Sequence, residues 1–378
     1  MTEIHICIAT GQNAANFIPL KQLRAEEVWI LETPSMKATK SAASLGVALR
    51  SAHEGIKLRT IAFNDSSPAT IMASAAKLAS DELDGRDVVL HITGGTKLMV
   101  LAIHQELALL ASGTGRYRTL YADTQRNTLD WMGEKPVQEP MQDVLTLQEL
   151  LQLRGYRTTN DTRPAKDQQR AAARADVTRF MGEKAGELKG FFGALNYHGR
   201  LAADGASLAQ PFNYLPGGAG GKLLSLAERN GLLQVAKPTS TVTFSDRASA
   251  EYFSGGWVEE YTFLKLTGIS KHGQYATNAK VIQNQSKTEN EIDVIAVHNN
   301  RCLIIECKAK KQEKAQDAIY KLGQVVRQVG GLMARGLYVS ALNVSEFDRS
   351  RANEYAIDVL AAEELQSINK YLRVWRAA

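Results

Sequence analysis

Residues 291–308, EIDVIAVHNNRCLIIECK, decide the fold of the C-terminal part of this chain. Two apolar runs flank the pair Asn299-Asn300, which predicts two strands joined by a tight turn. Side chains alternate between the faces of a strand, so Glu306 and Lys308 share one face. Asp293 comes thirteen residues before Glu306 and reaches the same side from the other strand. The hairpin is therefore expected to gather two carboxylates and one ammonium group.

Carboxylates arranged in this way suit a divalent cation. They offer the hard oxygen ligands that Mg²⁺ and Mn²⁺ prefer, and a neighbouring lysine can orient water or offset phosphate charge. The alternative is that Asp293, Glu306 and Lys308 form the solvated face of an ordinary hairpin. Against this, Glu306 and Lys308 extend the apolar run 303–305, and charges on a buried strand need a partner or a metal. We predict that Asp293, Glu306 and Lys308 are catalytic and that the two acids bind the metal.

A further acid of this site is expected on the helix that precedes the strands. In residues 256–261, GWVEEY, helical spacing places Trp257 and Tyr261 on one buried stripe. Glu259 and Glu260 both flank that stripe, and the residues alone do not choose between them. Both acids could also face solvent near the start of the helix.

The first 125 residues alternate short apolar runs with segments of helical periodicity. This alternation, with short connections, predicts a parallel, doubly wound sheet of the Rossmann type. The five apolar runs are 4–9, 28–31, 58–63, 88–92 and 119–122.

Two loops of this domain follow strands that can lie at the switch point of such a sheet, where ligands bind. The glycines allow backbone N–H groups to approach a phosphate, and Lys97 brings positive charge to a helix start. A phosphate-rich ligand is therefore expected, although a simple glycine turn before a helix is the alternative. Neither a G-x-G-x-x-G fingerprint nor a Walker A loop is present, so a dinucleotide redox cofactor and an NTPase are not supported. The candidate ligand-binding residues are Thr10, Gly11, Gln12 and Asn13 in the first loop, and Thr93, Gly94, Gly95, Thr96 and Lys97 in the second.

Composition places the chain among intracellular globular proteins. Its 378 residues, 44% hydrophobic, suffice for two or three domains. The chain has no apolar run of about 18 residues and no secretory signal, and its three cysteines lie in strand-like runs. These features predict a cytoplasmic protein with no membrane contact. Residues 151–250 carry 14 basic against 8 acidic side chains, the largest basic excess in the chain. Nucleic acid is a natural partner for this arrangement, although the charge could also solubilise a linker.

We expect three domains. Residues 1–157 form the ligand-sensing sheet, and polar residues after it mark the boundary. Residues 158–250 form linker helices and a small winged-helix-like module, because a helix at 223–233 precedes two short β-like runs. Residues 251–378 form an α/β core in the order helix, three strands, helix, strand, helix, which is typical of restriction-endonuclease-like folds.

In their order and spacing these motifs resemble the ancillary nucleases of type III CRISPR systems. Those proteins join a CRISPR-associated Rossmann fold (CARF) sensor to a PD-(D/E)xK nuclease domain. The second loop, 93–97, is similar to the sensor's ligand loop, and Asp293, Glu306 and Lys308 are similar to the nuclease motif. The resemblance also favours Glu259 as a catalytic and metal-binding acid. It implies that cyclic oligoadenylate, most of all cyclic tetra-adenylate, binds across a homodimer and switches on cleavage of DNA, RNA or both. We expect the signal to pass through the middle module.

Two other functions compete with this one. The chain could be a ligand-sensing winged-helix transcriptional regulator with an inactive nuclease-like domain, or a constitutive repair or restriction nuclease whose N-terminal domain only dimerises. Intact Asp293, Glu306 and Lys308 argue against the regulator, which has no need of them. DNA versus RNA preference, strandedness, cleavage sequence, activator ring size and degradation of the activator stay open.

Overall fold

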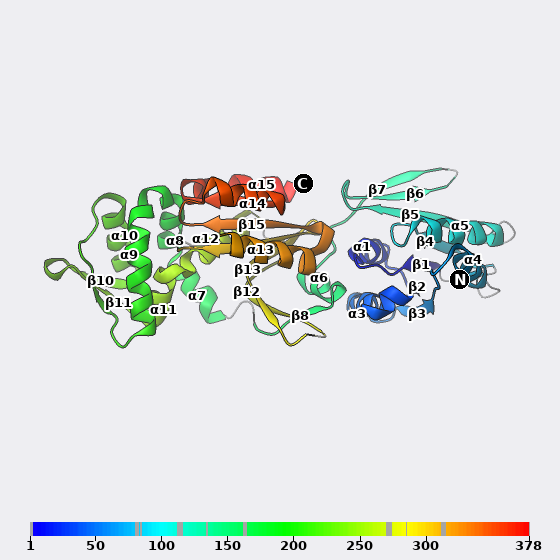
Figure 1. Cartoon of the computed structure of the whole chain (residues 1–378), viewed down its shortest axis with the longest axis horizontal. Helices are drawn as coiled ribbons and strands as arrows, with labels where there is room; N and C mark the ends of the chain where they lie inside the picture. The colour runs from blue at the N-terminus through cyan, green and yellow to red at the C-terminus, as the bar shows by residue number, and fades with distance from the viewer. Residues whose placement is uncertain are drawn as a thin grey trace.

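The computed structural model shows an elongated molecule of three bodies in a row (Figure 1). The N-terminal sheet lies at one end, the C-terminal sheet lies in the middle, and a helical module lies at the other end. None of the described helices combines the length and the apolar character that a membrane span requires. The residues described are 3–79, 83, 85–111, 116–133, 135–161, 165–269, 274–284, 286–310 and 315–377.

The N-terminal sheet has seven strands in the order β3-β2-β1-β4-β5-β6-β7, and its first five are parallel. The predicted doubly wound sheet is confirmed, with an antiparallel extension by the last two strands. The strands are β1 Ile4–Ile8, β2 Glu27–Glu32, β3 Lys57–Ala62, β4 Val88–His91, β5 Tyr117–Asp123, β6 Thr128–Met132 and β7 Val137–Pro140. The helices are α1 Ala14–Gln22, α2 Pro34–Ala38, α3 Ser41–Ala52, α4 Pro68–Leu78 and α5 Lys97–Ala111.

Helices cover both faces of this sheet because its central strands, β2, β1 and β4, are buried on both sides. Residues of α4 and α5, such as Ile71 and Ile103, pack against Ile6 and Leu90 on one face. Residues of α1 and α3 pack on the other face, against Cys7 among others.

The C-terminal sheet has six strands in the order β16-β15-β14-β13-β12-β8. Its elements are α6 Leu147–Leu153, β8 Tyr156–Thr158, α12 Trp257–Ile269, β12 Gln274–Gln283, β13 Glu289–His298, β14 Arg301–Lys308, α13 Ala315–Val325, β15 Ala334–Ser340, α14 Glu346–Glu354, β16 Ile357–Ala361 and α15 Ile368–Ala377. A π-helix, Val326–Gly330, continues α13.

This sheet differs from the expected core in two respects. α14 and β16 lie between the last expected strand and the closing helix, and the sequence did not reveal them because α14 is strongly polar and β16 is short. The expected boundary between residues 157 and 158 passes through β8, which pairs with β12 in the second sheet. The three residues of β8 are too few to show the alternation by which a strand is recognised in a sequence.

The middle of the chain forms a helical module with a three-stranded sheet, β10-β11-β9. A helix followed by an antiparallel hairpin, α10 and β10–β11, matches the expected winged-helix-like order. The elements are α7 Ala165–Ala173, α8 Ala175–Glu183, α9 Ala185–Asp204, β9 Ala209–Pro211, α10 Gly218–Arg229, β10 Leu233–Ala236, β11 Thr241–Phe244, α11 Arg247–Glu251 and the π-helix Tyr252–Gly256.

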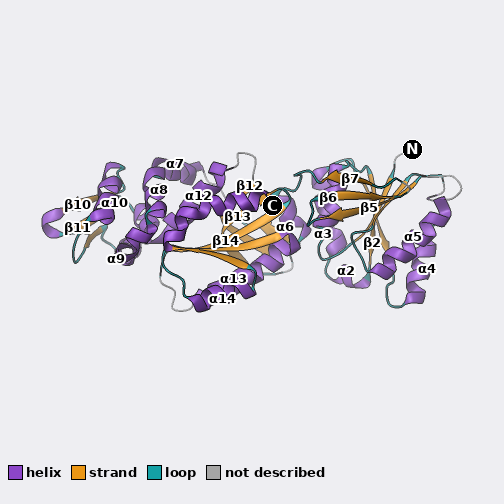
Figure 2. Cartoon of the chain, turned by 90° about the horizontal axis from the view of Figure 1, so that it is seen from above, coloured by secondary structure: helices purple, strands orange, loops and turns teal. Residues whose placement is uncertain are grey.

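The order of the bodies in space is not their order in the sequence. The C-terminal sheet lies between the N-terminal sheet and the helical module, as both views show (Figures 1 and 2). One hydrophobic core joins Phe17 and Leu49 of the N-terminal body to Ile295, Ile304 and α13 of the C-terminal body. A second core joins the other face of the C-terminal sheet to α8 and α9. The two outer bodies each contact the C-terminal body directly, so this arrangement favours a direct route for a signal over the expected route through the middle module.

Candidate active site and ligand loops

The hairpin β13–β14 brings together the residues that the sequence singled out. Its register pairs Val294 with Ile305, so Asp293 lies opposite Glu306. Asp293 Oδ2 accepts a hydrogen bond of 2.7 Å from the backbone N–H of Cys307. This bond fixes the carboxylate at the end of the β13–β14 ladder, beside the two charged residues of β14.

Lys308 joins the two carboxylates. Its Nζ forms an ion pair with Glu306 Oε1 and lies 3.7 Å from Asp293 Oδ2. All three side chains are largely buried, with 11% of Glu306, 15% of Asp293 and 23% of Lys308 exposed. A solvated hairpin face would leave them open to water, so the alternative of an ordinary polar surface does not fit the structure.

Burial and mutual charge shift the pKa values of this group. Burial and the charge of Asp293 raise the pKa of the Glu306 carboxyl, and Lys308 opposes them. For Lys308, burial disfavours the ammonium, but the charges of Glu306 and Asp293 outweigh it and raise the pKa of the side chain. Lys308 therefore stays charged at neutral pH and acts as the counter-ion of two crowded carboxylates.

The two candidate helix acids have different surroundings. Glu260 forms an ion pair with Arg174 of the helical module, whose guanidinium also stacks on Tyr252 with 4.1 Å to the ring centroid. Glu259 lies near Asp293 instead, and burial and the charge of Asp293 raise the pKa of its carboxyl from 4.5 to about 8. The electrostatics thus associate Glu259 with the hairpin and Glu260 with the module.

These residues fit a divalent cation in part. Asp293 and Glu306 are hard oxygen donors held close together by a positive charge, which is the environment that a bound cation would provide. Among the described residues, however, no group of three or more His, Cys, Asp or Glu side chains is arranged to hold a metal ion. Asp293 and Glu306 are thus already close enough to serve as two metal ligands. Glu259 would have to move toward them to serve as a third.

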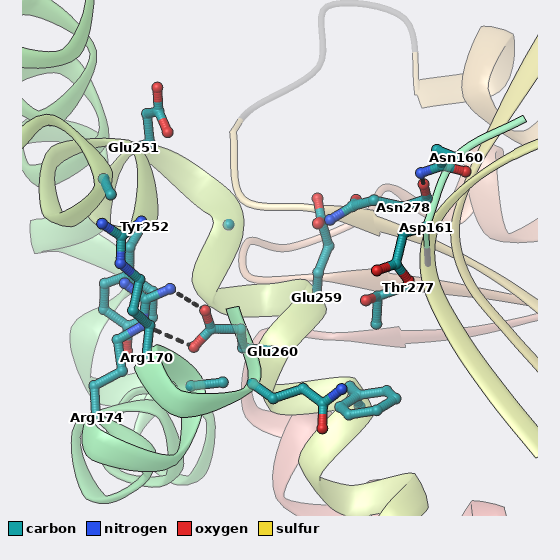
Figure 3. A pocket seen from close by; sticks show the side chains of 15 residues that line it. Asn160, Asp161, Arg170, Arg174, Glu251, Tyr252, Glu259, Glu260, Thr277 and Asn278 are labelled. Carbon is teal, nitrogen blue, oxygen red and sulfur yellow. Dashed lines mark hydrogen bonds and ion pairs between the residues drawn. The ribbon is translucent and has the colours of Figure 1, made fainter. Parts of the chain in front are cut away.

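A cavity of about 430 Å³ opens beside Glu259, between the C-terminal sheet and the helical module (Figure 3). Polar side chains of both bodies line it, among them Arg170 and Arg174 from the module and Asn160 and Asn278 from the sheet. Two arginines of the basic segment 151–250 therefore face the candidate active site.

The two expected ligand loops lie side by side. They follow β1 and β4, which pair with each other at the point where the strand order reverses. A Cβ on Gly94 would lie 2.5 Å from the carbonyl oxygen of Ile8, so only glycine permits this approach. Gly95 has φ +81°, the left-handed region that glycine adopts without strain. The glycines thus bring the second loop against the first.

The polar residues of these loops divide into two groups. Asn13 is buried, accepts a hydrogen bond from Thr10 N and donates to Ser41 O, and Thr93 Oγ1 accepts from Ala122 N at 2.7 Å. These side chains hold the loops in place. Thr96 caps α5 by accepting from Met99 N and is exposed together with Lys97 at the positive end of that helix. Gly11 and Gly95 are also exposed.

The first loop also contacts the C-terminal body. Gln12 Oε1 accepts a hydrogen bond of 3.1 Å from the backbone N–H of Leu332. Arg154 donates to the carbonyl oxygens of Gly11, Arg327 and Gln328, and so ties the loop to the π-helix before β15. Arg154 could not be recognised from the sequence, because its three acceptors are backbone atoms distant in the chain.

The turn of the β13–β14 hairpin inserts into the N-terminal body. Asn299 and Asn300 both have positive φ, and Asn300 is fully buried. Asn300 Oδ1 accepts from the backbone N–H groups of Val144 and Leu145, each at 3.0 Å, and its Nδ2 donates to Gln142 O at 2.7 Å. The predicted Asn-Asn turn is confirmed, and its hydrogen bonds also connect the two bodies.

Family models match both ends of the chain. The model of the Card1 CARF domain matches residues 4–150, and the model of the Card1-like endonuclease domain matches residues 246–378. Among curated proteins, none matches.

Solved structures share the fold. Can2 from Sulfobacillus thermosulfidooxidans, in complex with cyclic tetra-adenylate, is 20% identical, with a TM-score of 0.80 over 100% of both chains. VC1899 from Vibrio cholerae is 21% identical, with a TM-score of 0.85 over 99% of this chain and 98% of that one. A type III CRISPR defence DNA nuclease activated by cyclic oligoadenylate is 19% identical, with a TM-score of 0.55 over 90% of this chain and 45% of that one.

Proposed function

The chain belongs to the Card1-like nucleases, which join a CARF domain to an endonuclease domain, and we propose that it cleaves nucleic acid in type III CRISPR defence when a cyclic oligoadenylate binds. Membership in this family, together with an intact set of Asp293, Glu306 and Lys308, favours a nuclease over the transcriptional regulator that the sequence left open. DNA, RNA or both are its substrates.

Cleavage depends on a divalent cation, Mg²⁺ or Mn²⁺, held by Asp293 and Glu306 with Glu259 as the third ligand. The cation, when bound, polarises the scissile phosphate and lowers the pKa of a bound water. Lys308 keeps its ammonium beside both carboxylates and is placed to offset phosphate charge and to orient the attacking water. Asp293 is held for this role by the N–H of Cys307.

The activator is cyclic tetra-adenylate, bound by the exposed residues of the two glycine loops. A ring of four identical nucleotides can have two-fold symmetry, so a homodimer can present the same loops to both halves of the ring. Apolar side chains on α5 support self-association, since Leu98, Leu101 and Leu109 are 44%, 63% and 64% exposed. This helix begins at Lys97, so pairing through it brings two ligand loops together.

The route from activator to active site is short. The first loop contacts the segment before β15 in two places: Arg154 links it to the π-helix, and Gln12 binds Leu332 in the following turn, Gly331–Met333. β15 pairs with β14, which carries Glu306 and Lys308. The turn of the same hairpin is held by backbone N–H groups of the N-terminal body through Asn300. A movement of either loop therefore acts on the catalytic strands without an intermediate body.

One observation carries this proposal: the two carboxylates and Lys308 lie on a hairpin whose turn is embedded in the CARF domain. The test is cleavage of single- and double-stranded DNA and RNA by the full chain with Mn²⁺ or Mg²⁺, with and without cyclic tetra-adenylate. We expect cleavage only with both additions. Cleavage that is equally fast without the activator, or in a chelator, would contradict the proposal.

Two variants separate the sites. Asp293→Asn should reduce cleavage by about 100-fold or more, because it removes a metal ligand, and should bind the activator normally. Lys97→Ala should weaken activator binding in calorimetry and leave Mn²⁺ affinity unchanged. Unchanged activator affinity in the Lys97 variant would count against the loop as the ligand site.

A further inference from the structure

Asn278 has an unusual backbone conformation in the middle of a strand. Its φ is +49°, and among the described non-glycine residues with positive φ it alone lies inside a strand. The register of β12 on β13 pairs Thr277 with Val294 and Ala279 with Ile292, which places Asn278 opposite Asp293. Such a conformation costs on the order of 1–3 kcal/mol and persists only where the surroundings hold it.

A side chain from outside the strand holds this conformation. Asn160 Nδ2 donates to the carbonyl oxygen of Asn278 at 2.8 Å, and Asn160 Oδ1 accepts from Lys280 N at 2.9 Å. Asn160 follows the end of β8, whose last residue, Thr158, pairs with Val281. The Asn160 side-chain amide therefore takes the place of a neighbouring strand at the edge of the sheet. It binds the backbone of β12 on both sides of Ala279.

The left-handed backbone directs the Asn278 amide toward the helix acid. Figure 3 shows the nitrogen end of this amide pointing at the Glu259 carboxyl, on the wall of the cavity that both residues line. The Asn278 amide thus lies beside the Glu259 carboxyl as a hydrogen-bond donor. Figure 3 also places Asn160 and Thr277 near this contact.

We propose that Asn278 is a positioning residue of the nuclease, whose strained backbone and side-chain amide hold Glu259 in the orientation that metal binding requires. Asn160 acts behind it by keeping the backbone in place. The inference rests on the proposed nuclease site, in which Glu259 is the third ligand. Hydrogen bonds to a ligating carboxylate orient it, and their loss typically weakens metal affinity or activity by about 10- to 100-fold.

A purely structural role for Asn278 predicts a different outcome. If the strand only needs a residue that tolerates positive φ at this point, glycine serves at least as well, because it adopts that region without strain. Asn278→Gly therefore keeps the backbone and removes the amide. Ala356→Gly is the matched control, since Ala356 has φ +54°, is exposed, and lies in a turn of the same domain before β16.

The test compares wild type, Asn278→Gly and Ala356→Gly as full chains. Thermal unfolding, calorimetric Mn²⁺ binding and activator-dependent cleavage are measured for each. Asn278→Gly should unfold at the wild-type temperature or above, bind Mn²⁺ about 10-fold more weakly or worse, and lose kcat by a similar factor with unchanged KM. Ala356→Gly should match wild type in metal binding and cleavage. Asn160→Ala should shift Mn²⁺ affinity in the same direction as Asn278→Gly.

Failure of this inference is distinct from failure of the proposed function. A wild-type protein that neither binds Mn²⁺ nor cleaves would contradict the nuclease site itself. A wild-type protein that does both, with an Asn278→Gly variant that binds and cleaves equally well, would overturn only the role of Asn278.

Discussion

At the scale of single residues, the raised pKa of Glu259 makes the stability of the metal-free protein depend on pH. The carboxyl has a pKa of about 8 in the folded chain against an ordinary value of 4.5. The folded state therefore binds this proton more tightly than the unfolded state, so the free energy of unfolding falls as pH rises from about 4.5 to about 8. We expect Glu259→Gln to reduce this slope in thermal unfolding carried out in a chelator. An unchanged slope in the variant would show that Glu259 is not protonated in the folded protein.

Residue identity at the site was partly predictable. Asp293, Glu306 and Lys308 follow from strand alternation alone, because a hairpin converts spacing into proximity. The choice between Glu259 and Glu260 does not follow, because it depends on Arg174, which the chain places 86 residues before Glu260. Asn278 was hidden for a similar reason, since its conformation is imposed by Asn160 from another segment.

At the scale of elements, the turn of the β13–β14 hairpin is one of the places where the two bodies are joined. Asn300→Ala would leave the N–H groups of Val144 and Leu145 without their acceptor, at a cost of about 1–3 kcal/mol. We expect this variant to unfold at a lower temperature, to bind cyclic tetra-adenylate, and to cleave with a smaller increase on activator addition. Asn64→Ala is the control, because Asn64 accepts one N–H in an exposed loop of the N-terminal body. Activation equal to wild type in the Asn300 variant would contradict a role for this turn in signalling.

The elements themselves were largely predictable where periodicity was strong. The central strands of the first sheet and the β13–β14 hairpin are apolar runs bounded by turn residues, which is the clearest signal a sequence offers. β8 and β16 were not found, because β8 has three residues of which two are exposed, and β16 is only five residues long and directly follows a polar helix.

At the scale of the whole molecule, the basic segment lies across a cavity from the active site, and only some of its arginines face that cavity. Arg170 and Arg174 both line it, but Arg174 is held by Glu260, whereas Arg170 has only a longer contact of 3.9 Å with Asp246. Arg179 does not line the cavity and pairs with Asp176 on its own helix. We expect Arg170→Gln to weaken nucleic-acid binding similarly across sequences and to reduce the salt slope by about 0.7 to 0.9, which corresponds to one phosphate contact. Arg179→Gln should leave the slope unchanged. Equal slopes in wild type and the Arg170 variant would make this segment a solvated surface.

The continuous core between the two sheets has a thermodynamic consequence. Since Phe17 and Ile304 belong to one cluster of buried side chains, neither body can lose its packing without exposing apolar surface of the other. The sensor and the nuclease should therefore melt in one calorimetric transition. By linkage, activator at about 100 times its Kd then adds about 2.7 kcal/mol to the unfolding free energy of that joint unit. A sensor domain cut off at the end of its sheet would lose part of its own hydrophobic core. In the full chain, the melting temperature of the nuclease domain and the occupancy of the distant ligand loops therefore report on the same folding equilibrium.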